Sequence, residues 1–521
     1  MKKIIKNWWL TIFLGILIFA FGLGLRLYKL NFIPVFGDEA IYIRWSQIMK
    51  AEPTLRFVPL SDGKQPLFMW TMMPVFKLFK DPLFIGRFVS VLTGAVTLIG
   101  IMVLTYLLFK SKKAAVISGL IYAVFPFAFF FDRMAMADSM LSMFGVWFLI
   151  FALLTAKRVR LDFAMISGFI LGGALLTKSP ALFFVLLLPT TWIMSEWRKG
   201  TKNIAIHLIK LISLSAVMLA IGYGMYNILK LGPNFNMVAI RNKDYVYPIS
   251  HLWTSFKDPL LPFIKQALQW IWTMGPGAVI FLLLLGFAAN IKKYWKEVGL
   301  LLVWFLAPIL AQSEFAKVFT ARYILFSIPF LIVLSASAFV VKQKFVNMLA
   351  LIIFLAFLSQ AAKFDYYLLT DPERANLPRS ERSGYLEEWT SGTGIKEIAD
   401  FLKIESMKNP QQRIVVGTEG FFGTLPDGLQ IYVNDNPNIT VIGVGVYISG
   451  VHQSLIDSKK FGNPTYLVVN NTRFTANADK IGLKLLAAYP KAVRPNGSRE
   501  ALLFFEVTPN ALLPKPSVNK I

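Results

Sequence analysis

The chain has 521 residues, of which 56% are hydrophobic and 16% are charged. This amount of apolar surface exceeds what a soluble core needs and excludes an ordinary soluble enzyme. The net charge of +25 could suggest a nucleic-acid partner, but the Lys and Arg residues separate the apolar runs and form no single basic domain. No nucleic acid is therefore predicted. Since the chain has no cysteine, disulfides, thiolate metal sites and a thiol nucleophile are excluded.

The first apolar run extends from Trp8 to Leu25 and follows three lysines. It is longer than the apolar region of a signal peptide and lacks a small-residue cleavage site, so it predicts an uncleaved helix. Eleven apolar runs predict transmembrane helices, near 8–28, 84–109, 114–131, 139–156, 163–177, 180–195, 204–229, 266–289, 297–312, 322–341 and 345–362.

The connections between these runs alternate in charge. By the positive-inside rule, the basic connections are cytoplasmic. An odd number of spans then places the N-terminus in the cytoplasm and the tail beyond Lys363 outside a cell membrane. The basic connections lie at 110–113, 157–160, 198–202, 292–296 and 342–344.

The tail changes character at Thr370, where long apolar runs give way to Pro, Gly, Asn, Asp and Glu. We therefore expect a transmembrane domain over 1–365, with an outer loop at 30–83, and a soluble extracytoplasmic α/β domain over 366–521. In this tail the patterns predict helices at 395–407 and 480–488, and strands at 413–417, 466–470 and 502–507.

Two adjacent acids, Asp38 and Glu39, follow the first span. Ile41, Trp45 and Ile48 recur behind them at helical spacing, which predicts a short amphipathic helix lying against the membrane surface. In the simplest interpretation Asp38 is an N-cap, whose carboxylate accepts backbone N–H groups of the first turn. The alternative is a functional carboxylate.

Further charged residues gather in the predicted outer connections, where they run against the positive-inside trend. Each cation alone could be a side chain that reaches the interface. Together they suit the phosphate of an anionic lipid, because Arg binds phosphate through two hydrogen bonds and Lys as a point charge. These residues are Asp62, Lys64, Arg87, Arg133, Asp138, Lys178 and Arg322.

The same stretches resemble the polyprenyl-phosphate-dependent glycosyltransferases of the C-type fold. The resemblance is to the protein O-mannosyltransferase group and its bacterial relatives that modify lipid A with aminoarabinose, and it covers residues 1 to about 340. It implies sugar transfer from a polyprenyl-phosphate donor at the outer membrane face. The matching stretches are Asp38-Glu39-Ala40-x-Tyr42, Lys64 to Trp70, Arg87 with Ser90, Arg133 to Asp138, Gly172 to Pro180 and Lys317 to Leu325.

By this resemblance, Asp38 looks like the catalytic carboxylate, and its neighbour Glu39 shapes the acceptor site. The implied donor phosphate site comprises Lys64, Arg87, Arg133, Lys178 and Arg322, with Asp62 and Asp138 as further site acids. The chain departs from its aminoarabinose-type relatives at one point. They have an acid directly before the residue matched to Lys64, whereas this chain has Gly63 there and Asp62 one position earlier.

The chemistry needs only one base, because a glycosyl phosphate already has a good leaving group. Asp38 would take the proton of an acceptor hydroxyl while cations stabilise the charge that develops on the phosphate, and a single displacement inverts the anomeric centre. The acceptor stays open between a lipid, a glycan and a protein. No metal site is indicated, although a divalent metal is possible. The alternative function is a multi-span transporter of an anionic lipid or solute, since charges can also line a transport path.

Overall fold

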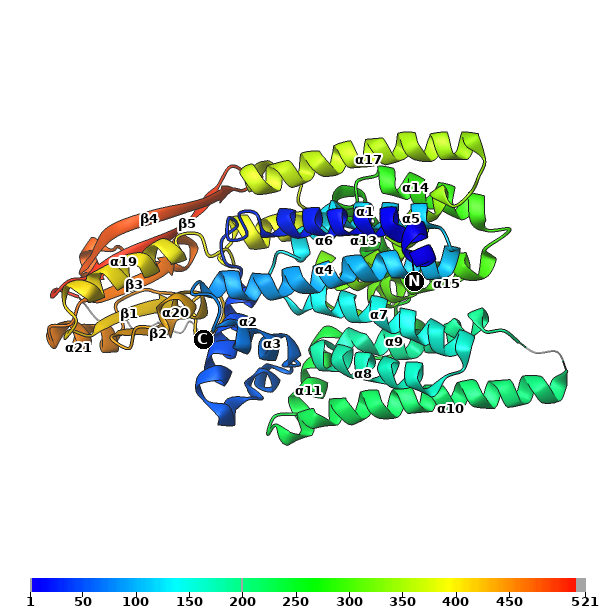
Figure 1. The fold of residues 1–521 in the computed structure, drawn as a ribbon. Coiled ribbons are helices and arrows are strands. Elements are labelled where there is room, and N and C mark those ends of the chain that lie inside the picture. The colour runs from blue at the N-terminus through cyan, green and yellow to red at the C-terminus, as the bar shows by residue number, and fades with distance from the viewer. Residues whose placement is uncertain (1, 198–199, 512–521) are drawn as a thin grey trace. The chain divides into compact units, whose positions relative to one another are not determined.

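The computed structural model describes residues 2–197 and 200–511, so two residues of the basic connection at 198–202 lie outside the described part (Figure 1). The chain divides into two compact units. The first, which we call the helical unit, comprises residues 1–30, 52–71 and 87–378, and the second, which we call the sheet unit, comprises residues 31–51, 72–86 and 379–521. Much of the predicted outer loop thus packs with the tail. The division into a membrane domain ending near 365 and an extracytoplasmic domain stays a prediction.

The helical unit is built from apolar helices that pack along one another, such as α8 against α10 and α7 (Figure 1). In chain order its helices are α1 (Lys2–Leu27), α4 (Pro82–Phe109), α5 (Lys112–Ala123), α6 (Pro126–Phe131), α7 (Ala137–Arg158), α8 (Leu161–Thr177), α9 (Leu182–Leu187), α10 (Thr201–Tyr226), α11 (Asn236–Tyr245), α12 (His251–Thr254), α13 (Leu260–Met274), α14 (Ala278–Asn290), α15 (Trp295–Phe315), α16 (Ile328–Ala336) and α17 (Lys344–Thr370). Helix α3 (Leu67–Val75) and the first turn of α4 cross the division between the units.

Seven helices in the described residues are long and apolar enough to cross a membrane, or eight if one bent pair forms a single span. Each of the eleven predicted runs coincides with helical structure, but several are too short or broken. The run at 114–131 is interrupted between α5 and α6, where Pro126 cannot continue the hydrogen-bond ladder. The run at 266–289 is α13 and α14, which meet at 104°. The chain is a polytopic helical membrane protein, although fewer helices than predicted meet the length requirement.

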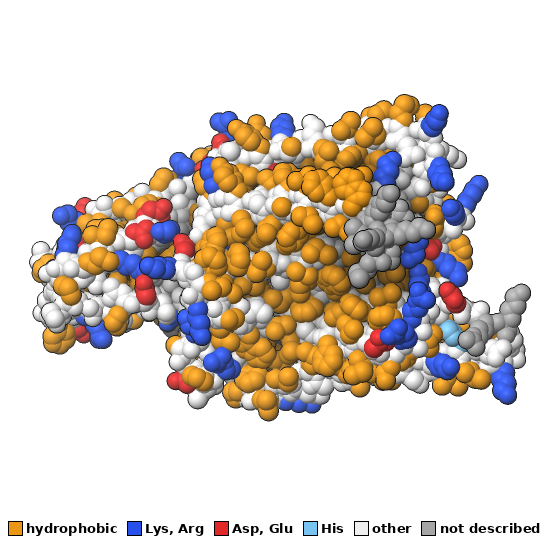
Figure 2. All heavy atoms as spheres, viewed as in Figure 1, with side chains coloured by type: hydrophobic (Ala, Val, Ile, Leu, Met, Phe, Trp, Pro, Cys, Tyr) orange, Lys and Arg blue, Asp and Glu red, His pale blue; other side chains and the backbone are white. Residues whose placement is uncertain are grey.

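The outer surface of the helical unit is apolar, as lipid-facing helices require. On α4, Leu92, Val96, Ile99 and Val103 stay exposed at helical spacing, whereas Val91, facing the other way, is fully buried. Figure 2 shows hydrophobic side chains covering most of this face, with few charged groups among them. The apolar runs in the sequence therefore supply both the packing between helices and the surface towards lipid.

The sheet unit contains one five-stranded mixed sheet of order β2-β1-β3-β5-β4. The first three strands are parallel, and β5 pairs antiparallel with both β3 and β4. Buried residues including Leu455, Leu467 and Phe505 form a core against the sheet. Its elements are α2 (Gly37–Ala51), α18 (Arg379–Arg382), α19 (Ile395–Lys408), β1 (Ile414–Glu419), α20 (Asp427–Val433), β2 (Ile439–Gly445), α21 (Gln453–Lys460), β3 (Thr465–Asn470), β4 (Leu483–Val493) and β5 (Arg499–Val507).

The predicted α/β character of the tail is confirmed, and the predicted strands correspond to β1, β3 and β5. The predicted helix at 480–488 is wrong, because most of this segment is the strand β4. Gly482, with a φ of 73°, ends the preceding turn, and β4 then pairs with β5 from Leu483 onwards. Cross-strand pairing outweighs the weak helical spacing here, since packing context decides strand formation more than local preference does.

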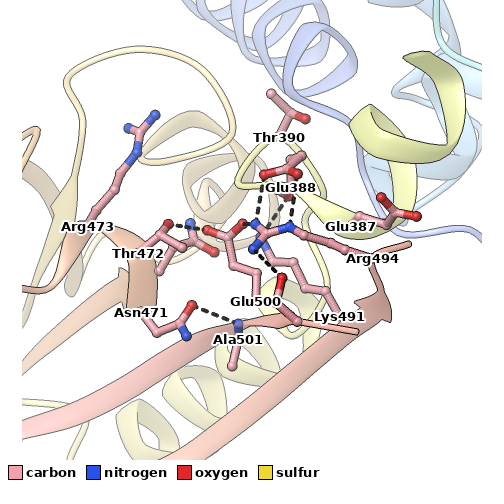
Figure 3. Close-up of polar contacts among 12 residues, drawn as sticks. Glu387, Glu388, Thr390, Asn471, Thr472, Arg473, Lys491, Arg494, Glu500 and Ala501 are labelled. Carbon is pink, nitrogen blue, oxygen red and sulfur yellow. Dashed lines mark hydrogen bonds and ion pairs between the residues drawn. The ribbon is translucent and has the colours of Figure 1, made fainter. Parts of the chain in front are cut away.

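Charged side chains join the segment at 387–388 to the β4–β5 hairpin (Figure 3). The Arg494 guanidinium donates to both carboxylate oxygens of Glu388, at 2.9 and 2.8 Å, and also pairs with Glu500. Lys491 donates to the backbone carbonyl of Glu388 at 3.0 Å and is 1% exposed. Burial lowers the pKa of Lys491 to about 8, although the carboxylates of Glu500, Glu419 and Glu388 oppose this shift.

Candidate active site

The two predicted acids lie in the first turn of α2, but their surroundings differ. Glu39 is fully buried, and its carboxylate accepts the backbone N–H of Phe36 at 3.0 Å. The Phe36 carbonyl in turn accepts the N–H of Ala40, so Phe36 occupies the N-cap position and Glu39 reaches back to it as in a capping box. Asp38 is partly exposed. Glu39 thus has the helix-starting function that the simplest sequence interpretation gave to Asp38.

Helix α2 is confirmed, but it does not lie on a surface with one open face. Ten of its fifteen residues are buried, and it packs against α20 in the sheet unit. Gln47 donates to the carbonyl of Ile431 at 2.9 Å, and Arg44 donates to the side chain of Asn434 at 2.6 Å. These two polar side chains of α2 therefore contact α20 and the residue that follows it. The sequence could not reveal this partner, because α20 lies far along the chain.

The start of α2 is also fixed by the segment that leads into the sheet. The Gly37 N–H donates to the carbonyl of Thr390 at 3.1 Å. The Phe36 ring stacks on Tyr385 with a centroid distance of 4.3 Å. The Thr424 hydroxyl, which donates to the Thr390 carbonyl, lies so near Gly37 that a Cβ there would be 2.9 Å from the hydroxyl oxygen. Glycine therefore permits Thr424 to approach the start of α2. The tail therefore positions the turn that carries Asp38.

In the helical unit, Lys64 belongs to a charged group that the sequence only partly predicted. Asp62 lies 3.7 Å from the Lys64 ammonium and 2.8 Å from the guanidinium of Arg241. Gly63 between them has a φ of 67°, and a Cβ there would lie 2.7 Å from the Arg241 side chain. Glycine at this position lets Asp62 reach Arg241, which gives the departure from the relatives a structural reason.

Sequence reasoning missed Arg241, which lies on the short polar helix α11. The available signal was weak, because α11 is neither apolar nor amphipathic. However, the stretch from Gly232 to Pro259 is too polar for a span and too long for a simple turn, and such connections often carry function.

Three more predicted residues come together from separate connections of the helical unit. The Lys178 ammonium donates to Asp138 at 2.6 Å and lies 4.7 Å from the ring centroid of Tyr323. The Arg322 guanidinium is 5.5 Å from the same ring. The segments carrying Lys64 and Lys178 also touch, because Gln65 donates to the Ser179 hydroxyl at 2.8 Å. Lys64, Lys178 and Arg322 thus lie on segments that contact one another.

Arg133 and Arg87 lie in a different place, at the C-terminal end of α1. Arg133 is 1% exposed and donates to the backbone carbonyls of Arg26, Tyr28 and Lys29 at 2.8 to 3.0 Å, with a further contact to Leu25 at 3.1 Å. Arg87 is fully buried and donates to the carbonyl of Leu30 at 2.9 Å. These contacts satisfy carbonyls that a helix end leaves without partners.

A buried ion pair beneath this helix end was also not predicted. Arg26 donates to Asp132 at 2.9 Å, and both side chains are at most 1% exposed. The Tyr122 and Ser139 hydroxyls donate to the same carboxylate at 3.0 and 2.6 Å. This pair holds α1 against the neighbouring segments, because separating Arg26 from Asp132 would leave two buried charges without a partner.

The group that contains Lys64, Arg241, Lys178 and Arg322 has four cations and three carboxylates, Asp62, Asp138 and Asp244, so it has a surplus of one positive charge. Lys64 and Arg241 are partly exposed, at 26% and 34% of their side chains. Such a group is suited to an accessible phosphate. Among the described residues, no cluster of three or more His, Asp or Glu side chains could hold a metal ion.

A polytopic helical unit joined to an α/β unit is the architecture of the C-type glycosyltransferase fold. Residues 63–223 match the family model described as dolichyl-phosphate-mannose-protein mannosyltransferase. The resemblance noted in the sequence is thus confirmed over this segment, which contains Lys64, Arg87, Arg133 and Lys178. Asp38 and Arg322 lie outside it. A comparison with curated protein sequences finds no match.

Solved structures of similar fold cover nearly the whole chain. The crystal structure of ArnT from Cupriavidus metallidurans in the apo state has 15% identity and a TM-score of 0.57, over 96% of this chain and 99% of that one. Its form bound to undecaprenyl phosphate has 16% identity and a TM-score of 0.56 over the same shares. The apo oligosaccharyltransferase of Archaeoglobus fulgidus has 14% identity and a TM-score of 0.51, over 89% of this chain and 70% of that one. At these identities the likeness shows the fold.

Proposed function

We propose that this protein transfers a sugar from a polyprenyl-phosphate donor to a hydroxyl group of a lipid, glycan or protein acceptor, with Asp38 as the general base. The observation that carries the proposal is the difference between the two acids. Glu39 is buried and holds the N–H of Phe36, whereas Asp38 beside it is partly exposed. A base must reach the proton it removes, so Asp38 is the better candidate.

The donor phosphate is assigned to the surplus cations of the helical unit. Lys64 and Arg241 are partly exposed and share Asp62, and Lys178 and Arg322 are joined to them through contacting segments. Arg87 and Arg133 take an indirect role in this proposal, because their hydrogen bonds hold the end of α1 from which the chain continues to Asp38. The family match over residues 63–223 supports a polyprenyl-phosphate sugar as the donor.

In the reaction, Asp38 takes the proton of the acceptor hydroxyl as its oxygen attacks the anomeric carbon. The bond between the anomeric carbon and the phosphate oxygen breaks, and the phosphate leaves with the electron pair of that bond. The cations stabilise the negative charge of the leaving phosphate. One displacement inverts the anomeric centre. The positive-inside pattern supports an extracytoplasmic acceptor and a cytoplasmic N-terminus.

The test is an assay of the purified full chain with radiolabelled polyprenyl-phosphate sugars and candidate lipid, glycan and protein acceptors. Release of polyprenyl phosphate should depend on the acceptor, and the anomeric configuration of the product should be opposite to that of the donor. Asp38→Asn should bind donor but lose roughly 100-fold or more in turnover, the scale expected for a positioned general base.

Glu39→Gln is the matched variant. It removes the charge but keeps an amide oxygen that can accept the Phe36 N–H, so its main loss should be in stability. Near-normal turnover of a folded Asp38→Asn protein would refute the assignment of the base. If no donor and acceptor pair reacts while labelled substrate is carried across proteoliposomes, the protein is a transporter and the proposal fails.

A further inference from the structure

The helical unit contains a second place where an anionic group could bind, and it shares no residue with the proposed donor site. A cavity of about 900 Å³ lies between the break that joins α13 to α14 and one face of α17. This volume is in the range of cavities that bind organic ligands.

The face of α17 that lines the cavity changes from apolar to polar along the helix. Ile352 and Ala356 lie at one end, followed at helical spacing by Gln360, Lys363 and Tyr367. The distance from Ile352 to Tyr367 is about 22 Å at 1.5 Å per residue. The apolar part alone, up to Gln360, spans about 12 Å, which is close to the roughly 15 Å depth of one hydrocarbon leaflet.

The polar end of the cavity has positive charge in excess. The Lys363 side chain is exposed, and its ammonium has no hydrogen bond or ion pair with any residue that the structure describes. Arg374 also lines the cavity, and among the residues that the structure describes its guanidinium pairs with the partly exposed Asp371 alone, at 2.9 Å. A lipid-facing lysine without a partner is costly unless its ammonium reaches a polar group at the membrane interface.

The break between α13 and α14 adds polar backbone to the same end. Pro276, Gly277 and Ala278 line the cavity, and the Ala278 N–H points to the Gln360 side-chain oxygen at 3.4 Å. The first turn of α14 therefore presents the positive end of its helix dipole to the cavity. Apolar walls of leaflet depth with cations and a helix start at one end fit one class of ligand, a bilayer lipid with a phosphate-bearing head.

We propose that this cavity binds an anionic phospholipid of the bilayer, with its acyl chains along Ile352 and Ala356 and its phosphate between Lys363 and Arg374. The proposal does not rest on the transferase activity. It assigns the cavity to a bound lipid other than the sugar donor, because none of the cations of the proposed donor site lines the cavity.

The test is native mass spectrometry of the purified full chain after exposure to equimolar phosphatidylglycerol and phosphatidylcholine. The wild type should retain phosphatidylglycerol with roughly 30-fold preference, since each Lys or Arg near the membrane surface gives about a fivefold attraction to an anionic lipid. Replacing both cations, Lys363→Gln with Arg374→Gln, should remove the preference. Lys344→Gln, at the opposite end of α17, is the matched charge control and should keep it.

A steric variant tests the cavity independently of charge. Ala356→Trp should fill the apolar walls and reduce retention of both lipids, whereas Leu351→Trp, on an exposed part of α17 outside the cavity, should not. Equal retention of the two lipids by the wild type, or an unchanged preference in the double variant, would overturn the proposal. So would displacement of phosphatidylglycerol by an equal concentration of polyprenyl phosphate, because the cavity would then belong to the donor.

Discussion

The buried Lys491 predicts a pH dependence for the stability of the sheet unit. Its pKa is about 8 in the folded unit, against an ordinary value of 10.5. Below pH 8 both the folded and the unfolded chain carry the proton, so the cost of burying the charge is fully present. Between these values the unfolded chain binds more protons, so the free energy of unfolding increases with pH. The full difference is worth about 3 kcal/mol.

Only part of this difference lies in a convenient pH range. From pH 7.5 to pH 9.5 the gain in stability should be about 2 kcal/mol, which corresponds to a roughly 20-fold smaller fraction of open molecules. Burial raises the pKa of Tyr466 to about 12 and also raises the pKa of Tyr489, so these two tyrosines keep their protons over this range. A variant without the lysine is needed to assign the slope to Lys491.

The absence of natural cysteines makes the measurement direct. A single Val469→Cys change places a thiol in β3, where the valine is fully buried, and its labelling rate in the detergent-solubilised full chain reports opening of the sheet unit. The rate is divided by that of the unfolded chain at each pH, which removes the thiol's own titration. Lys491→Met should abolish the pH slope, and Lys484→Met, an exposed lysine on the same strand, should keep it. Equal slopes in the wild type and Lys491→Met would refute the reasoning.

Two further predictions separate a phosphate-binding arginine from a structural one. Arg241→Gln should increase the donor KM by about 10-fold with little change in stability, because it removes one charged hydrogen-bond donor from the proposed phosphate site. Steady-state assays measure this, with Arg160→Gln, which changes a surface arginine paired with Asp162, as the control. Equal donor KM values for the two variants would contradict the prediction. Arg133→Met should lower the free energy of unfolding by about 3 kcal/mol or more, because the buried Arg26 carbonyl and the part-buried carbonyls of Tyr28 and Lys29 lose their donor. Heat-dependent loss of the monodisperse chromatographic peak, compared with exposed Arg158→Met, tests this. Wild-type stability with impaired donor binding would instead favour direct contact with the donor.

The sequence could predict the features that depend on composition along the chain. The apolar runs mark the helices because lipid contact and helix packing both need apolar side chains. The acids after the first span were visible as a local anomaly. The sequence could not show which acid holds the helix start, since Asp and Glu are both suited to a first turn. Here Glu39, three residues after Phe36, has the reach to accept its N–H.

The remaining features depend on contacts between distant segments. An arginine near a membrane face suits both a lipid phosphate and the carbonyls at a helix end, so the sequence alone could not separate Arg133, which donates to the end of α1, from Arg241, which pairs with Asp62. Arg241 was missed because its helix is short and polar. The incorrect helix at 480–488 has the same origin, because its conformation is set by pairing with β5.

The tail, to which the sequence resemblance assigned no function, has a physical relation to the proposed base. The Gly37 N–H donates to Thr390, and Arg494 and Lys491 hold the neighbouring Glu388 against the sheet. Because α2 also packs on α20, Asp38 belongs to the same compact unit as the sheet. The position of the proposed base within this unit therefore depends on its contacts with the tail. A catalytic group must be held to within about 1 Å of its working position, so these contacts are a support that the proposed role of Asp38 requires.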